Sequence, residues 1–211
     1  MTVDLVAPDE ALWASWLESR DEWGGPQADQ PGSALGVAQR LDLDLASRDG
    51  FGQWVQELLA QPEAVPGPDI VPATNWWIAR GGRYLGAIQM PHSMNEILAD
   101  VGGHIGYGVR PPERRQGIAS TALQEMLTCA TQPVGLGRVL IARNEMNVGS
   151  RKAIEVCGGL LASVRPADQS TATSAVRETR SATGRQRACR ASVDLYAATH
   201  SCHGRACLPW T

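Results

Sequence analysis

The chain has 211 residues, of which 43% are hydrophobic, and it carries 19 basic and 22 acidic side chains for a net charge of −3. This length allows one domain with a sizeable core, and the near-balanced charge argues against nucleic acid or an anionic membrane as a partner. The five cysteines have no regular spacing, and the sequence shows neither a signal peptide nor an apolar run of the roughly 20 residues that a spanning helix needs, so we expect a cytoplasmic protein.

The N-terminal part of the chain predicts one short strand, two helices and a loop. Residues 2–6 can form the strand, and Asp9 can cap the helix that follows. Residues 24–36 are rich in Gly, Pro, Gln and Ala and predict a loop. A second helix is expected from about residue 52 to residue 61. Trp13, Trp16 and Trp54 lie at helical spacing with other apolar residues and are expected in the core.

From Thr74 onward the hydrophobic pattern changes to a period of two, which indicates strands. A hairpin is expected over residues 74–90, with its turn at Gly81-Gly82, and a helical turn over 95–100. The remaining predicted elements are a strand at 103–109, a helix at 115–130, a strand at 138–142, a helix at 148–157 and a strand at 160–164. This order predicts an α/β (α+β) domain in which helices flank a mixed central sheet.

Composition changes near residue 164 and divides the chain into two parts. Residues 1–164 carry 12 basic and 19 acidic side chains, whereas residues 165–211 carry 7 and 3 and hold three of the five cysteines. We predict that residues 1–164 form the domain. We predict that residues 165–211 are a basic tail, disordered apart from a weak strand at 193–196, or the product of a shifted reading frame. Its histidines and cysteines match no zinc spacing, so no metal site is expected.

The segment that carries chemistry runs from Gly102 to Ala119 and reads GGHIGYGVRPPERRQGIA. A strand ends, two prolines turn the chain, and a helix begins in which the small residues Gly117 and Ala119 let a phosphate approach the backbone. The unpaired amides of the first turn favour an anion, and Arg114 and Arg115 add positive charge. The segment is neither a P-loop nor a dinucleotide-binding turn. It predicts a diphosphate site.

This arrangement resembles the GNAT superfamily of N-acetyltransferases, in which a strand, a proline and Arg-x-x-Gly-x-Ala open a helix. A second match, NVGSRKAIEVCGG at 147–159, resembles the family's Asn-x-x-Ser/Ala signature followed by a helix and a glycine pair. The resemblance covers about residues 74–164 and implies the GNAT-type acyl-CoA N-acyltransferase fold. It also implies acetyl-CoA as co-substrate, no metal, and direct attack of a neutral amine on the thioester.

Carried over by position, the resemblance assigns the acetyl-CoA site to three segments. Backbone groups of Gly108, Val109 and Arg110 would pair with the pantetheine arm where the sheet splays beside this strand. Asn147 and Ser150 would bind the far side of the arm. The amides of the phosphate turn would hold the diphosphate, and its residues are Arg114, Arg115, Gln116, Gly117, Ile118, Ala119 and Ser120.

The proton transfers are left open by the sequence. His104 lies in the predicted strand near the gap, and His92 and Glu96 follow the hairpin where a substrate loop is expected, so these three are the candidates for the general base. Each has an ordinary structural role as its alternative. Many members of the superfamily protonate the leaving thiolate with a tyrosine, but the matching residue here is Ile154. Another group or water must then do so, or activity is impaired.

We therefore expect the chain to acetylate a primary amine of a small molecule, of which an amine-bearing antibiotic is a special case. One alternative is a non-catalytic acyl-CoA-binding regulatory domain, and another is a protein amino-group acetyltransferase. Neither nucleic acid nor a membrane is expected as a partner, and a homodimer is left open.

Overall fold

The computed structural model describes residues 3–67, 71–95, 98, 103–131, 139–166 and 192–198. Its elements follow the predicted order with three additions, the helix α2 and the short 3₁₀ helices η2 and η4. In chain order they are β1 (Asp4–Val6), η1 (Glu10–Leu12), α1 (Trp13–Glu22), α2 (Leu35–Arg40), α3 (Arg48–Ala60), η2 (Gln61–Glu63), β2 (Ala73–Arg80), β3 (Arg83–Pro91), β4 (Gly106–Val109), η4 (Pro111–Glu113), α4 (Ile118–Thr131), β5 (Val139–Asn144), α5 (Val148–Val156), β6 (Leu160–Pro166) and β7 (Ser192–Ala198).

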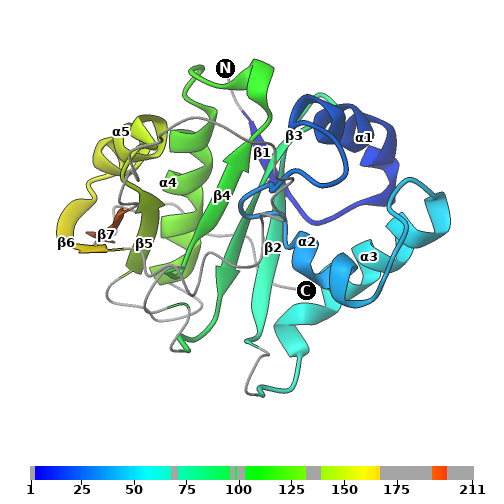
Figure 1. Cartoon of the computed structure of the whole chain (residues 1–211), viewed down its shortest axis with the longest axis horizontal. Coiled ribbons are helices and arrows are strands. Elements are labelled where there is room, and N and C mark those ends of the chain that lie inside the picture. The colour runs from blue at the N-terminus through cyan, green and yellow to red at the C-terminus, as the bar shows by residue number, and fades with distance from the viewer. Residues whose placement is uncertain are drawn as a thin grey trace, which may run out of the picture.

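The strands form two sheets rather than the single central sheet predicted (Figure 1). The first has the order β1-β2-β3-β4 and the second the order β5-β7-β6, with antiparallel pairing between neighbours in both. An isolated bridge between Gly103 and Ile141 joins them just before β4 begins. Beyond this bridge β4 and β5 are not paired, so β4 is an edge of the first sheet, and we call this break in the pairing between the two sheets the gap.

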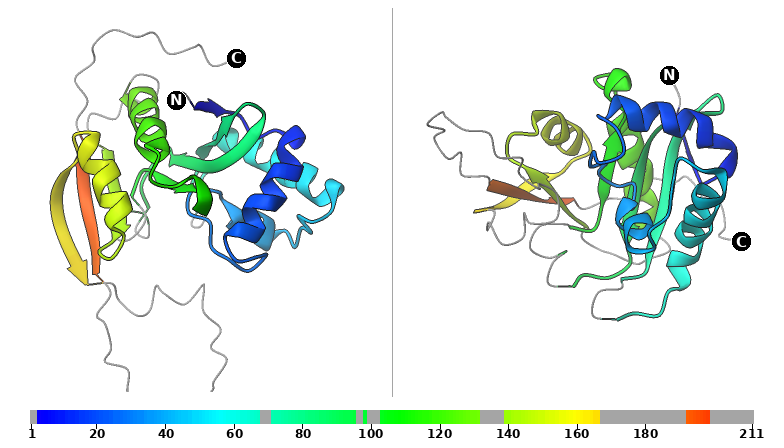
Figure 2. Two further views of the ribbon diagram at one scale, coloured as in Figure 1. Left: turned by 90° about the horizontal axis from the view of Figure 1, so that it is seen from above. Right: turned by 45° about the vertical axis from the view of Figure 1, so that its right-hand side comes forward.

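Two hydrophobic clusters cover the two faces of the first sheet. On one face lies α4, which buries Ile118, Leu123, Met126 and Leu127 as its sequence pattern predicted. On the other face lie α1, α2 and α3, where the rings of Trp16, Phe51, Trp54 and Trp77 stand 5.2–5.8 Å apart. Figure 2 shows α4 and these three helices on opposite sides of the strands. The prediction that three tryptophans belong to the core is confirmed for Trp16 and Trp54, whereas Trp13 is only partly buried against this cluster.

Side-chain caps explain where the helices begin. Asp9 accepts a hydrogen bond from the Ala11 amide at 2.9 Å and starts η1, as predicted. The Ser47 hydroxyl accepts one from the Gly50 amide at 3.0 Å, so α3 begins four residues earlier than expected. The unpredicted α2 has no side-chain cap, and its N-cap residue Ala34 has a φ of 58°.

The C-terminal strand β7 lies between β5 and β6 and pairs with both. The strand predicted at 193–196 is therefore confirmed and extends over seven residues. Most of the tail predicted to be disordered, together with His200, Cys202, His203 and Cys207, lies outside the described residues. The predicted turn at 95–100 does so largely as well. None of the helices in the described part is long and apolar enough to cross a membrane.

Candidate functional site

The backbone groups of β4 divide between its neighbour and the gap. The Arg110 amide donates to the Leu85 carbonyl of β3 at 2.8 Å, and the Gly108 carbonyl points to β3 as well, against Gly86. Because alternate residues of a strand present their amides and carbonyls to opposite edges, those of Val109 face the gap. Of the three predicted pantetheine contacts, only Val109 presents its backbone groups to the gap, and because its carbonyl accepts from Arg114 Nε at 2.9 Å, its amide is the group left for an extended arm. Gly108 and Arg110 are already used inside the sheet.

The glycines of β4 let the segment that follows α1 lie directly on the strand. A Cβ at Gly108 would stand 2.6 Å from the Pro31 carbonyl oxygen, and a Cβ at Gly32 would stand 2.5 Å from the Gly106 carbonyl oxygen. Gly32 also has a φ of +78°, which other residues rarely adopt. The glycine at position 108 is therefore explained by its close contact with the segment 24–33, of which Pro31 and Gly32 lie on β4.

The turn between β4 and α4 has the shape of a phosphate cradle. Arg115 and Gly117 have left-handed backbones, with φ of 63° and 80°. The first helical hydrogen bond runs from the Thr121 amide to the Gly117 carbonyl at 3.0 Å, so the amides of residues 117–120 precede the helical ladder. No described atom lies within 4 Å of a Cβ built on Gly117, which leaves the backbone open there. Such turns form anion-binding concavities and suit the diphosphate of acetyl-CoA.

The two arginines of this turn point in different directions. Arg114 donates from Nε to the Val109 carbonyl at 2.9 Å, and its guanidinium carbon lies 4.4 Å from the centre of the Trp23 ring. It therefore lies along the gap edge of β4 and ties the end of α1 to the turn. Arg115 is also exposed and adds a second positive charge to the turn. Gln116 donates to Glu113 at 3.3 Å.

The opposite wall of the gap comes from the first turn of α5. Asn147 caps this helix, because its Oδ1 accepts a hydrogen bond from the Ser150 amide at 3.0 Å. The Ser150 hydroxyl lies 2.7 Å from the hydroxyl of Tyr107, which projects from β4. This contact, which the sequence analysis missed, spans the gap between β4 and α5. Burial raises the pKa of Tyr107 to about 12, so the phenol keeps its proton at neutral pH.

Ile154, at the position where many relatives of the resembled family carry tyrosine, is fully buried in the cluster beneath α4. It packs against Gly159, where any Cβ would collide with its side chain. The second glycine of the pair therefore has a packing role. An isoleucine side chain cannot transfer a proton, whereas Ser150 on α5 and Tyr107 on β4 bring two hydroxyls together 2.7 Å apart.

His104 is hydrogen-bonded to Leu140 of β5 through both its backbone and its ring. Its own amide donates to the Leu140 carbonyl at 2.6 Å, and the Leu140 amide donates to Nδ1 of the ring at 3.0 Å. Because an amide can only donate, Nδ1 is an acceptor and the neutral ring carries its proton on Nε2. Burial lowers the pKa of His104 and keeps the ring neutral. In this state the ring has no free acceptor, so the geometry opposes the prediction that His104 is the base.

His92 lies at the same end of the sheet as His104, away from the phosphate turn. Its Nε2 is 2.7 Å from the Thr74 hydroxyl. Burial lowers the pKa of His92, although the charge of Glu63 opposes the shift, so the ring is neutral near pH 7. Glu96, the third predicted candidate for the base, lies outside the described residues.

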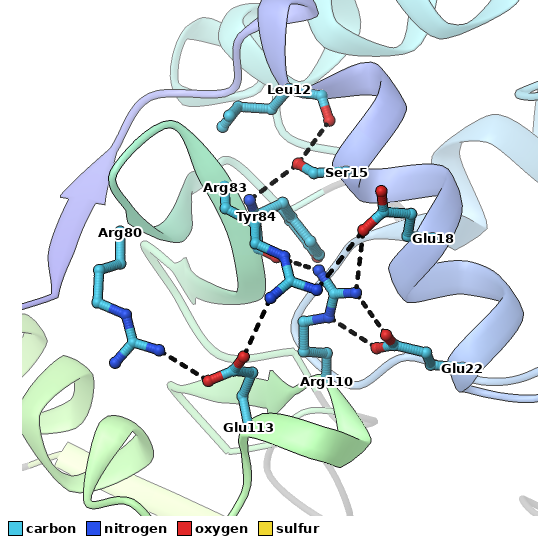
Figure 3. Close-up of polar contacts among 9 residues, drawn as sticks. All are labelled: Leu12, Ser15, Glu18, Glu22, Arg80, Arg83, Tyr84, Arg110 and Glu113. Carbon is cyan, nitrogen blue, oxygen red and sulfur yellow. Dashed lines mark hydrogen bonds and ion pairs between the residues drawn. The ribbon is translucent and has the colours of Figure 1, made fainter.

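Arg110 connects β4 to α1 through a contact that the sequence did not reveal (Figure 3). Its side chain is 0% exposed, and Nε and Nη2 donate to the two carboxylate oxygens of Glu22 at 2.7 and 2.6 Å. Nη1 donates to the Tyr84 carbonyl at 3.0 Å. These hydrogen bonds hold the pKa of Glu22 below its usual range. All three guanidinium nitrogens of Arg110 therefore donate hydrogen bonds within the protein.

Further ion pairs extend from Arg110 to the turn. Glu18 lies 3.5 Å from Arg110 and 3.6 Å from Arg83. Arg83 and Arg80 in turn contact the Glu113 carboxylate at 3.3 and 2.7 Å. Acids and arginines thus alternate from α1 to η4, as Figure 3 shows. The acid next to the phosphate turn, Glu113, is neutralised by two arginines.

Comparisons with known proteins agree with this geometry. The family model described as acetyltransferase (GNAT) domain matches residues 37–159. No curated protein gave a significant match. Within the described residues, no group of three or more His, Cys, Asp or Glu side chains is arranged to hold a metal ion.

Solved structures with the same fold include three acetyltransferases. The ribosomal L7/L12 α-N-protein acetyltransferase RimL in complex with coenzyme A is 17% identical, with 94% of each chain covered and a TM-score of 0.57. The microcin C7 self-immunity acetyltransferase MccE, in complex with acetyl-CoA and AMP, is 12% identical, with 93% of this chain and 92% of that chain covered and a TM-score of 0.58. The ribosomal-protein-S5-alanine acetyltransferase from Vibrio fischeri is 13% identical, with 93% of this chain and 91% of that chain covered and a TM-score of 0.58. At these identities the likeness concerns the fold.

Proposed function

The chain belongs to the GNAT acetyltransferase family, and from this premise we propose that it transfers the acetyl group of acetyl-CoA to a primary amine of a small molecule. One observation carries the proposal. A gap between two sheets has the free edge of β4 along one wall and a turn of unpaired amides at its end. A long, flexible thioester with a diphosphate at the far end matches both features.

The residues of the gap have separate tasks in binding. The Val109 amide pairs with the pantetheine arm, since the Val109 carbonyl accepts from Arg114, and the amides of residues 117–120, with Arg115, hold the diphosphate. Asn147 uses Oδ1 as the helix cap, so its amide nitrogen is the group that meets the arm from the other wall. When bound, acetyl-CoA supplies an activated acetyl carbonyl and a thiolate leaving group.

Transfer forms a C–N bond to the acceptor, breaks the C–S bond, and moves one proton from nitrogen and another to sulfur. The Tyr107 hydroxyl holds the Ser150 hydroxyl at 2.7 Å on the wall of the gap, and we assign to this pair the proton delivered to sulfur. Neutral His92 is the described candidate to accept the proton of the amine. His104, which lacks a free acceptor, instead fixes the end of the gap through Leu140.

The covering of β4 favours a compact acceptor. The segment 24–33 lies so close to the strand that neither Gly32 nor Gly108 has room for a Cβ. A small amine can reach the gap beside this segment more easily than a folded protein surface can. A second candidate acceptor is a protein α-amino group, which the resemblance in fold to two ribosomal-protein acetyltransferases favours.

Thiol release from acetyl-CoA tests the proposal. The full chain is incubated with acetyl-CoA and either small primary amines or peptides with free N-termini, and acetylated products are identified by mass spectrometry. Turnover with small amines supports the proposal, and turnover with peptides alone favours the second candidate. Binding of acetyl-CoA without turnover of any amine would instead indicate a non-catalytic acyl-CoA-binding domain. A folded chain that does not bind acetyl-CoA would refute all three.

A further inference from the structure

The start of the phosphate turn is fixed by Arg110. This residue is the N-cap of η4, and its carbonyl accepts a hydrogen bond from the Glu113 amide at 3.1 Å. Its amide and Nη1 bind two consecutive carbonyls of β3, those of Leu85 and Tyr84, at 2.8 and 3.0 Å. Backbone and side chain of one residue are therefore attached to the same neighbouring strand.

A buried guanidinium needs a charged partner to stay in this place. Arg110 is 0% exposed, and Glu22 provides a bidentate pair in which both carboxylate oxygens accept. Glu22 belongs to α1 and lies 88 residues earlier in the chain. If Glu22 loses its charge, the cost of a poorly compensated buried cation drives the Arg110 side chain toward solvent. The attachment at the start of the turn then loosens.

The end of the turn is fixed by the core. Ile118, the first residue of α4, is 4% exposed and packs in the cluster beneath the sheet. Between Arg110 and Ile118 the chain passes through two left-handed residues, Arg115 and Gly117. Left-handed backbone at a residue with a side chain is strained and persists only when its surroundings impose it. The directions of the phosphate-binding amides therefore depend on both fixed ends.

A second contact links the same end of α1 to the turn. Trp23 follows Glu22 directly, and its ring stacks with the Arg114 guanidinium at 4.4 Å. Arg114 also donates to the Val109 carbonyl. Glu22 and Trp23, at the end of α1, thus contact Arg110 just before the turn and Arg114 within it.

On these contacts we propose that Arg110 and Glu22 are positioning residues for the diphosphate of acetyl-CoA. The inference rests on the proposed function, and it assigns a role in co-substrate binding to helix α1. Neither side chain touches the diphosphate: Arg110 holds the backbone at the start of the turn, and Glu22 holds Arg110. Their loss should weaken only those ligand contacts that the turn makes.

Two ligands that differ in the diphosphate test this role. Dissociation constants are measured for acetyl-CoA by calorimetry and for S-acetylpantetheine, which lacks the diphosphate, by ligand-observed NMR. Glu22→Gln keeps the size of the side chain and removes its charge, so we expect about tenfold weaker binding of acetyl-CoA and unchanged binding of S-acetylpantetheine. Arg110→Met should act in the same way, and the double variant should be no weaker than the worse single one, because the pair works as a unit.

The neighbouring Asp21→Asn is the matched control. It removes the same charge from the same helix, but Asp21 is 66% exposed and pairs with Arg20 at the surface, so its acetyl-CoA affinity should match the wild type. Circular dichroism establishes that each variant is folded, and Glu22→Gln decides the matter if Arg110→Met does not fold. Equal weakening for both ligands, or none for either, overturns the inference. A wild-type chain that fails to bind acetyl-CoA would refute the proposed function itself.

Discussion

Replacing Gly108 by alanine tests the packing of the segment 24–33 on β4. The new Cβ would stand 2.6 Å from the Pro31 carbonyl oxygen and 3.4 Å from Cζ2 of Trp23. Reaching an ordinary contact distance of 3.4 Å requires a shift of roughly 0.8 Å in backbone that has no flexible end to move. Overpacking of this kind costs about 1–3 kcal/mol, and the loss of a glycine from a strand returns roughly 0.5–1 kcal/mol. We expect a net loss of about 1–2 kcal/mol in the free energy of unfolding.

Urea denaturation of the full chain measures this loss, and Gly106→Ala provides the matched control two residues away. A Cβ at Gly106 would stand 3.6 Å from the Gly32 Cα, which is an ordinary contact. This variant should equal the wild type or exceed it by a few tenths of a kcal/mol. If Gly108→Ala is as stable as Gly106→Ala, the segment does not lie on β4 as closely as described, and our explanation of Gly108 fails.

Three further changes test other parts of the site. His104→Ala leaves the Leu140 amide without its acceptor, so we expect a loss of about 1 kcal/mol in urea denaturation but an unchanged acidic limb in the pH profile of kcat, because that limb reports protonation of the general base; disappearance of that limb would make His104 the base after all. Tyr107→Phe removes the hydroxyl that contacts the Ser150 hydroxyl, so we expect kcat to fall about tenfold with little change in acetyl-CoA affinity. An unchanged kcat would exclude Tyr107 and Ser150 from delivering the proton to sulfur. The pKa of Glu22 is lowered in the folded chain, so the ionised carboxylate contributes to folding stability above its unfolded pKa, and this contribution is lost as pH falls through its folded pKa. Glu22→Gln should therefore weaken the loss of stability at acidic pH. Equal losses in the variant and the wild type would contradict the ion pair.

Elements with local signals could be predicted from the sequence. The hairpin turn at Gly81-Gly82 and the buried face of α4 follow from glycine and from hydrophobic period, which act over a few residues. The helix α2 could not be found in this way, because it begins after a left-handed Ala34 with no capping side chain. The early start of α3 had a signal that was overlooked, namely Ser47 three residues before Gly50.

The candidate site likewise contains parts that local sequence patterns predict and parts that they do not. The phosphate turn depends on prolines, arginines and a glycine within ten residues, and its left-handed Gly117 lies where the pattern predicted an open backbone. The contacts of Tyr107 and Arg110 join residues 43 and 88 positions apart. No period or spacing encodes such pairs, since only the packing of α5 and α1 brings them together. The state of His104 likewise follows from a backbone amide that the sequence cannot place.

Local pairing also explains how a chain with a net charge of −3 can offer a site for a diphosphate. Three acids, Glu18, Glu22 and Glu113, lie near the turn and would repel the ligand if they were unpaired. Each is in contact with at least one arginine, and a compact pair presents little field beyond about 8 Å in physiological salt. The exposed Arg115 and the unpaired amides then determine the potential that a phosphate meets. Net charge describes the whole surface, whereas binding here depends on which charges remain uncompensated within one turn of backbone.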